Sequence, residues 1–252
     1  MSSALELALV SCALLGLRHG FDYDHLAAIT DITSVQRTWR EGMGLGLLYA
    51  LGHALTVAIL GAAVIFLHLG LPAHMDAVGE RLVGATLIVL AVYVLITFLR
   101  RKPGSTHQHA IPVSRIALLI SGARYTGWKL RSLANPELPR PEPFRFQYDR
   151  SSVFVVGVIH GLGAETPSQL LLFLLAANLG GTSRGFLGLL CFIVGLLVMN
   201  TLMTASASGI FASSKQRPRL QMFVTSLTAA YSLIIGTIFL LGISDKLPAL
   251  VR

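Results

Sequence analysis

Charged residues are scarce in this chain. Only 13% of its 252 residues are Asp, Glu, Lys or Arg, whereas 54% are hydrophobic and the mean hydropathy is +0.69. A soluble globular domain carries about 25% charged residues. The composition therefore excludes an ordinary water-soluble fold and predicts an integral membrane protein.

Other features are also missing. There are only two cysteines, Cys12 and Cys191, each inside an apolar run, and we interpret both as small core residues. No basic segment precedes the first apolar run, so we expect that run to be retained as a membrane span. Neither a P-loop nor an H-E-x-x-H motif occurs, which argues against an ATP-driven pump and a zinc protease of that type. We expect no bound cofactor.

Six apolar runs are long enough to cross the roughly 30 Å of membrane hydrocarbon, which takes about 20 residues. They extend from Ala4 to about Ile29, Gly44 to His68, Leu82 to Leu99, Val153 to Ala177, Gly185 to Ile210 and Gln221 to Ile243. We therefore predict an all-α integral membrane protein of about six transmembrane helices.

The basic residues fall mostly on one side of this predicted membrane. If the six spans alternate in direction, the loops after the first, third and fifth hold fifteen of the twenty lysines and arginines. Because basic loops face the cytoplasm, we place both termini outside, in a multi-pass protein of the cell (inner) membrane. The net charge of +8 is then a topology signal, and no nucleic-acid partner is needed to explain it.

A basic loop divides the chain. Residues 101–150 hold six of the ten prolines, a poor composition for a compact domain, so we interpret the segment as a cytoplasmic linker. It separates a first membrane half, 1–100, from a second, 151–252. Within it, Val113 to Leu133 mixes apolar and basic residues, which suits either a helix on an anionic lipid surface or a solvated loop.

The two halves share a motif. Gly16 to Asp24 and Gly157 to Glu165 both have the pattern G-x-x-H-G-x-x-x-acid. Histidine and carboxylate residues are rare in membrane spans, so their repetition is informative. With three spans in each half, the second copy runs in the opposite direction across the membrane. We therefore predict a 3+3 inverted repeat, an arrangement typical of secondary transporters.

Polar residues inside the spans need a reason, because each is costly unless paired, hydrated or bound to an ion. Imidazole and carboxylate groups together suit a borderline divalent ion such as nickel, cobalt or zinc. The candidate metal ligands are His19, Asp24, His25, His53, His160 and Glu165. Arg18, Asp22 and Asn200 are candidate supporting residues.

The first cluster cannot act from a straight helix. At about 100° per residue, Asp24 lies roughly 140° around the axis from His19. Either the helix unwinds near Gly20, with Asp22 paired to Arg18 or orienting a histidine, or only some of these residues bind the ion. An interfacial salt-bridge network around Arg18 is the alternative. His53 can instead form a hydrogen bond to a neighbouring helix, and for Asn200 such an interhelical bond is the preferred interpretation.

At this point the residues resemble a known family, the nickel/cobalt transporters. Their H-x4-D-H signature is similar to the run from His19 to His25, and a second signature, around G-H-S, is similar to Gly52-His53-Ala54. The family's L-G-x-D-T-A-T-E run resembles Leu162 to Gln169. The resemblance implies a metal permease and adds Thr166 and Gln169 to the supporting residues.

The chain departs from that family in three ways. Glu165 and Gln169 replace an aspartate and a glutamate, and both acids of a later D-T-x-D motif are replaced, one of them by Asn200. The family usually has eight spans rather than six. The sequence therefore resembles a compact, divergent member.

We expect transport of nickel or cobalt, most simply uptake, with the ion as substrate and the lipid bilayer and metal ion as partners. The sequence leaves open whether the protein forms a homo-oligomer. The alternatives are an exporter of the same fold, an intramembrane metal-dependent hydrolase, a thiol-disulfide carrier that uses the two cysteines, and a receptor or assembly subunit with a vestigial site.

Overall fold

The computed structural model describes residues 3–67, 74–99, 150–163 and 181–248, and between them only residues 125, 128, 129 and 132. The chain forms two compact units, one of residues 1–95 with 149–252 and one of residues 96–148. The predicted linker, 101–150, falls almost entirely outside the described residues, and so does its Val113 to Leu133 segment.

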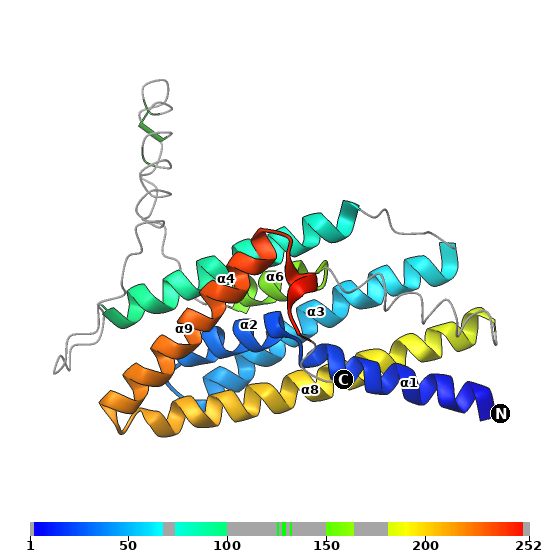
Figure 1. Ribbon diagram of the computed structural model, residues 1–252, viewed down its shortest axis with the longest axis horizontal. Helices are drawn as coiled ribbons and strands as arrows, with labels where there is room; N and C mark the ends of the chain where they lie inside the picture. Colours follow the sequence, from blue (N-terminus) through cyan, green and yellow to red (C-terminus); the bar gives the residue numbers. More distant parts are fainter. Residues whose placement is uncertain are drawn as a thin grey trace. The chain divides into compact units, whose positions relative to one another are not determined.

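The described parts of the chain are helical (Figure 1). The helices are α1 (Ser3–Gly20), α2 (Tyr23–Ser34), α3 (Trp39–Leu67), α4 (His74–Leu99), α6 (Arg150–His160), α8 (Thr182–Ser214) and α9 (Pro218–Leu240), followed by the short 3-10 helix η1 (Ser244–Lys246).

Within the described residues, four helices are long and apolar enough to cross a membrane. They cover Trp39–Phe66, Ala77–Thr97, Thr182–Ser214 and Pro218–Leu240, which correspond to the second, third, fifth and sixth predicted spans. Their outward side chains are apolar: Val194, Val198 and Leu202 on α8 are each about half exposed. Because apolar surface of this kind is buried by lipid, the chain is a multi-pass α-helical membrane protein.

The first predicted span is divided into two helices. α1 ends at Gly20 and α2 begins at Tyr23, so the predicted interruption near Gly20 is present. The turn is closed by two tight hydrogen bonds, from Phe21 N to Arg18 O (2.9 Å) and from Asp22 N to His19 O (3.1 Å).

The fourth predicted span is described only in its first part. There, α6 ends at His160, and two hydrogen bonds with the same spacing follow it, from Leu162 N to Ile159 O (3.0 Å) and from Gly163 N to His160 O (2.9 Å). The two copies of the repeated motif therefore end their helices in the same way.

Glycines allow the helices of the two halves to pack closely. A Cβ atom on Gly16 of α1 would overlap the carbonyl oxygen of Phe192 on α8, and one on Gly157 of α6 would overlap the carbonyl oxygen of Tyr49 on α3. Close approach of this kind is how helices associate in membranes. Thus α1 packs against α8, α6 packs against α3, and α3 and α8 contact each other between them (Figure 1).

The same pairing recurs on the partner helices. A Cβ on Gly52 of α3 would overlap the carbonyl oxygen of Phe154, and one on Gly195 of α8 would overlap that of Ala13. Relative to the motif histidines, Phe154 and Ala13 occupy the same position, six residues earlier. The packing of α1 on α8 and of α6 on α3 therefore uses equivalent contacts.

Both cysteines lie where α1, α3 and α8 meet. Cys12 is buried in an apolar cluster with Ala54, Phe192 and Leu196, and the partly buried Cys191 packs against it. Both are free thiols. The interpretation as a small core residue is confirmed for Cys12. Because both thiols lie at the same cluster, the thiol-disulfide alternative stays a prediction.

Candidate metal centre

The break between α1 and α2 directs two histidines to one place. His19 lies in the last turn of α1 and His25 in the first turn of α2. In an uninterrupted helix, six residues would turn the two side chains about 120° apart. The break removes that constraint, so the H-x4-D-H segment works as the end of one helix and the start of the next.

His53, near the middle of α3, completes what we call the histidine cluster: His19, His25 and His53. One ring nitrogen from each lies within 4.8 Å of the others. The three rings are buried, with exposed fractions of 6%, 0% and 0%. The centroids of the His25 and His53 rings are 4.4 Å apart, and His19 lies 5.0 and 5.2 Å from them.

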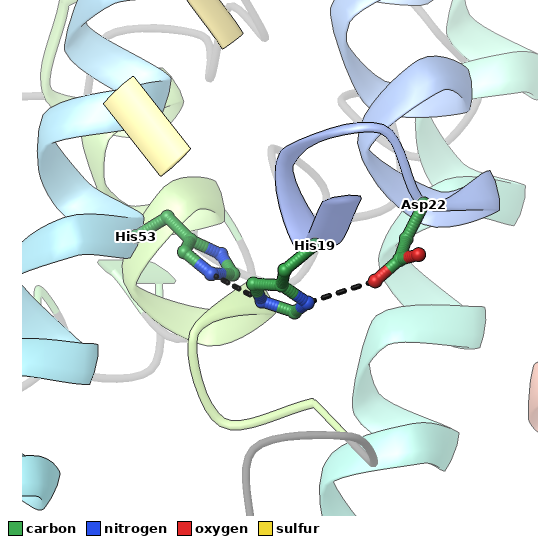
Figure 2. A network of polar contacts seen from close by, with 3 residues as sticks. All are labelled: His19, Asp22 and His53. Carbon is green, nitrogen blue, oxygen red and sulfur yellow. Dashed lines mark hydrogen bonds and ion pairs between the residues drawn. The ribbon is translucent and has the colours of Figure 1, made fainter. Parts of the chain in front are cut away.

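The spacing within the histidine cluster suits a shared ion. The Nε2 atoms of His19 and His53 are 3.2 Å apart and point toward each other (Figure 2). With metal–nitrogen bonds of about 2.0–2.1 Å, two nitrogens on one ion lie about 3 Å apart. Without an ion, the same spacing is a hydrogen bond in which one of the two Nε2 atoms carries the proton.

Asp22 fixes the orientation of His19. His19 Nδ1 donates to Asp22 Oδ2 at 2.8 Å, as Figure 2 shows. A proton held on Nδ1 leaves the Nε2 lone pair directed toward His53, which is how carboxylates support metal-binding histidines. Asp22 is the N-cap residue of α2 but makes no capping bond with its side chain. Of the two predicted roles for Asp22, the structure shows the one that orients a histidine.

Unpartnered nitrogens make the histidine cluster a candidate binding site. Among the described residues, His53 Nδ1 has no hydrogen-bond partner, and His25 has none apart from the Asn200 amide. A buried polar atom without a partner costs about 1–3 kcal/mol, and more where no water can reach it. An ion bound to His25 and His53 would remove part of this cost.

Two more predicted residues lie close to the histidine cluster. Asn200 of α8 is fully buried, and its amide has no hydrogen-bond partner among the described residues apart from the His25 ring beside it. Asp24, in the first turn of α2, is 6% exposed and lies within electrostatic reach of Tyr49 and His160. A carboxylate in this position favours a nearby cation.

His160 is buried but stands apart from the histidine cluster. Its Nδ1 lies 3.0 Å from the Tyr49 hydroxyl and its Nε2 lies 2.7 Å from Thr86 Oγ1. Because Thr86 donates its own proton to the Val83 carbonyl oxygen (2.7 Å), it accepts from His160 Nε2, and Tyr49 donates to Nδ1. Both nitrogens of a neutral His160 are therefore engaged, and its role as a metal ligand stays a prediction.

The other predicted residues contribute differently. Arg18 is exposed and makes no ion pair within the described part of the chain, so the structure gives no sign there of a salt-bridge network around it. Glu165, Thr166 and Gln169 lie outside the described residues, and their predicted roles stay predictions.

Sequence reasoning missed Tyr49, Thr86 and Asp31. The Tyr49 ring contacts both His25 and His160, with centroids 5.9 and 5.5 Å away. Its position one helical turn before His53 could have revealed it. Asp31 is fully buried on α2. Asp31 lies two residues beyond the predicted end of the first span at about Ile29, whereas α2 continues to Ser34 and buries it.

Several named proteins have sequences similar to this one. The cobalt transport protein NhlF of Rhodococcus rhodochrous is 29% identical over 252 residues, which cover 93% of this chain and 70% of that protein. The nickel transporter NixA of Staphylococcus aureus is 26% identical, covering 92% and 72%. The urease accessory protein UreH of a Bacillus species is 24% identical, covering 93% and 91%. No family model and no solved structure matches the chain.

The chain is thus similar to four proteins named as nickel or cobalt transporters, as the resemblance of its motifs led us to expect. The likeness to NhlF and NixA extends over nearly the whole chain, so it includes the second half, where the family motifs are altered. The chain spans about 70% of the length of these two transporters.

Proposed function

We propose that the protein carries a divalent transition-metal ion, nickel or cobalt, across the cell membrane, and that the histidine cluster holds the ion during passage. The observation that carries this proposal is the convergence of three buried imidazoles from α1, α2 and α3, with ligand atoms within 4.8 Å and two of the rings left with unpartnered nitrogens. Neutral imidazole is a preferred ligand of both metals.

The end of α1 and the start of α2 add to the electrostatics of the site. The carbonyl end of a helix carries a partial negative charge that favours a cation, whereas the amide end carries a positive one. Asp22 and Asp24 offset the positive end of α2, so the break as a whole attracts a cation. Broken helices at the binding site are typical of secondary transporters.

Transport also needs a site that opens alternately to either side, and a 3+3 inverted repeat would provide this. Three observations support it: the shared motif, the identical hydrogen-bond pattern after His19 and His160, and the equivalent contacts of Gly16 with Phe192 and Gly157 with Tyr49. Movement of one half against the other would expose the histidine cluster to each side in turn.

The predicted orientation has independent support. The Lys215 ammonium, in the turn between α8 and α9, donates to the backbone carbonyls of Gln36 and Arg37, between α2 and α3. These two basic connections therefore lie on the same side of the protein, as the count of positive charges requires. We assign that side to the cytoplasm and propose uptake, since the membrane potential favours inward movement of a cation.

The rival functions have less support. The relatives NhlF and NixA are named as transporters, which favours transport over an intramembrane hydrolase. The proximity of Cys12 to Cys191 keeps the thiol-disulfide alternative testable: replacing both with Ala should leave metal flux unchanged.

The direct test is flux of radiolabelled nickel and cobalt into proteoliposomes, together with equilibrium metal binding to the purified protein. We expect His25→Ala to abolish both. The control removes two other histidines, His107 and His109 in the linker, by substitution with Ala, and should behave as wild type. A folded wild-type protein that neither binds nor moves either metal would overturn the proposal.

A further inference from the structure

One buried face of α8 carries polar side chains whose hydroxyl groups make no hydrogen bond within the described residues. Asn200, Thr204 and Ser208 recur at four-residue intervals, so they lie on one side of the helix. Their exposed fractions are 0%, 0% and 3%. Neither hydroxyl oxygen has a hydrogen-bond partner among the described residues, and the Asn200 amide has none apart from His25. We call these three residues the polar stripe.

Other hydroxyls on the same helix behave differently. Thr201 donates to the Leu197 carbonyl (2.6 Å), Ser213 to Ile210 (3.0 Å) and Ser214 to Phe211 (2.9 Å). Bonding to the preceding turn is how Ser and Thr are normally satisfied within a membrane helix. Thr204 and Ser208 do not use this solution, so their oxygens are left free on a buried face.

Glycines of α3 face the polar stripe. A Cβ on Gly46 would lie 2.5 Å from Thr204 Oγ1, and a Cβ on Gly42 would lie 2.5 Å from Ser208 Oγ. By contrast, a Cβ on Gly44 would meet nothing within 4 Å. The Gly46 Cβ would also overlap Thr204 Cγ2, so the Thr204 and Ser208 side chains pack directly on α3 where it carries glycine, whereas Gly44, on the other side of the helix, lacks such a neighbour.

The polar stripe connects the histidine cluster with the predicted cytoplasmic side. Asn200 lies beside His25. From Asn200, eight residues of helix extend about 12 Å to Ser208. The helix then continues to the α8–α9 turn, where Lys215 contacts the α2–α3 connection. The polar stripe therefore begins at the binding site and runs toward the basic side of the protein.

Helix association alone does not account for this arrangement. Polar residues that hold membrane helices together do so by hydrogen bonds between the helices, as Thr56 does when it donates to the Val158 carbonyl at 3.0 Å. Thr204 and Ser208 make no such bond within the described residues. The amide and hydroxyl oxygens of the polar stripe are weaker ligands for nickel or cobalt than imidazole, which suits release rather than retention.

We propose that the polar stripe and the facing glycines Gly42 and Gly46 form the path by which the partly hydrated metal ion leaves the histidine cluster toward the cytoplasm. This inference rests on the proposed transport function. Conduction requires sites weak enough for the ion to leave. Along this path the oxygens of Asn200, Thr204 and Ser208 replace some of the ion's water ligands in succession.

The test combines nickel flux into proteoliposomes with equilibrium nickel binding. The double variant Thr204→Val with Ser208→Ala removes two hydroxyls that act in succession. Because the slower of the two steps limits flux, we expect flux at saturating nickel to fall about tenfold, the effect of losing one hydrogen-bonding group at that step. The dissociation constant should stay within twofold of wild type, because the histidine cluster is untouched. The control Thr201→Val removes a hydroxyl that bonds within α8 and should keep wild-type flux.

Two further variants cover the case in which the double variant does not fold. Thr204→Ser keeps the hydroxyl and should retain flux, whereas Gly46→Ala narrows the path and should reduce it, with Gly44→Ala as the matched control. Wild-type flux in both the double variant and Gly46→Ala would overturn the exit path, as would equal losses in the two control variants. A wild-type protein without any metal flux would instead overturn the proposed function.

Discussion

Asp22 offers a sharp test of how the histidine cluster works. Its carboxylate holds the Nδ1 proton of His19 at 2.8 Å, so that Nε2 faces the site. Removing a carboxylate behind a metal-binding histidine lowers metal affinity by about 10–100-fold. Because the Asp22 side chain is 24% exposed, water competes for the bond. We therefore expect Asp22→Ala to weaken nickel binding by the lower end of that range, about tenfold.

The conservative variant separates orientation from direct binding. Asp22→Asn keeps an oxygen that can accept from His19 Nδ1 but loses the charge, so it should lie between Asp22→Ala and wild type. The assay is equilibrium dialysis of the purified protein with radiolabelled nickel, with Asp245→Ala in η1 as a control that removes the same charge elsewhere. Unchanged affinity in Asp22→Ala would refute the reasoning. Equal and much larger losses in both Asp22 variants would make Asp22 a direct ligand.

Three further predictions concern other parts of the protein. We expect His53→Ala to abolish nickel binding and His160→Gln to retain it, because both ring nitrogens of His160 are already bonded; X-ray absorption counts the imidazole ligands, and loss of one in His160→Gln would contradict this. Gly195→Ala should destabilise the protein by about 1–3 kcal/mol through overlap with a backbone carbonyl, whereas Gly44→Ala should not, as measured by thermal unfolding in detergent. Asp31→Asn should unfold at the same or a higher temperature, since it removes a fully buried charge that no ion pair balances among the described residues and keeps an oxygen for the neighbouring Ser232; a clear loss would reveal a bound cation there.

Several features of the fold could be predicted from the sequence because the membrane limits the choices. Apolar runs of membrane-spanning length predicted α3, α4, α8 and α9, since a chain in lipid must satisfy its backbone within each helix. The interruption at Gly20 followed from the geometry of His19 and Asp24, which a straight helix could not aim at one ion. The similarity of the two motifs could also be recognised in the sequence, because glycine and histidine rarely recur at the same spacing in two apolar helices by chance.

The composition of the site was less accessible. His19, His25 and His53 were all predicted candidates, but so was His160, whose sequence context is the same as that of His19. What separates the two is the neighbourhood of each ring. His19 meets another histidine on α3, whereas His160 meets a tyrosine and a threonine on α3 and α4. Periodicity within one helix holds no information about the residue that a different helix places opposite.

The sequence by itself therefore determined the class of protein, the broken first span and the kind of chemistry, because hydropathy, motif spacing and ligand type are properties of local sequence. The tertiary structure alone decided which imidazoles share a site, that Asp22 holds His19 rather than Arg18, and that Thr204 and Ser208 are left unpartnered opposite glycines. These outcomes depend on which faces of α1, α3, α6 and α8 meet. That choice is made by close backbone contacts at glycines far apart in the chain, which a reading along the sequence cannot pair.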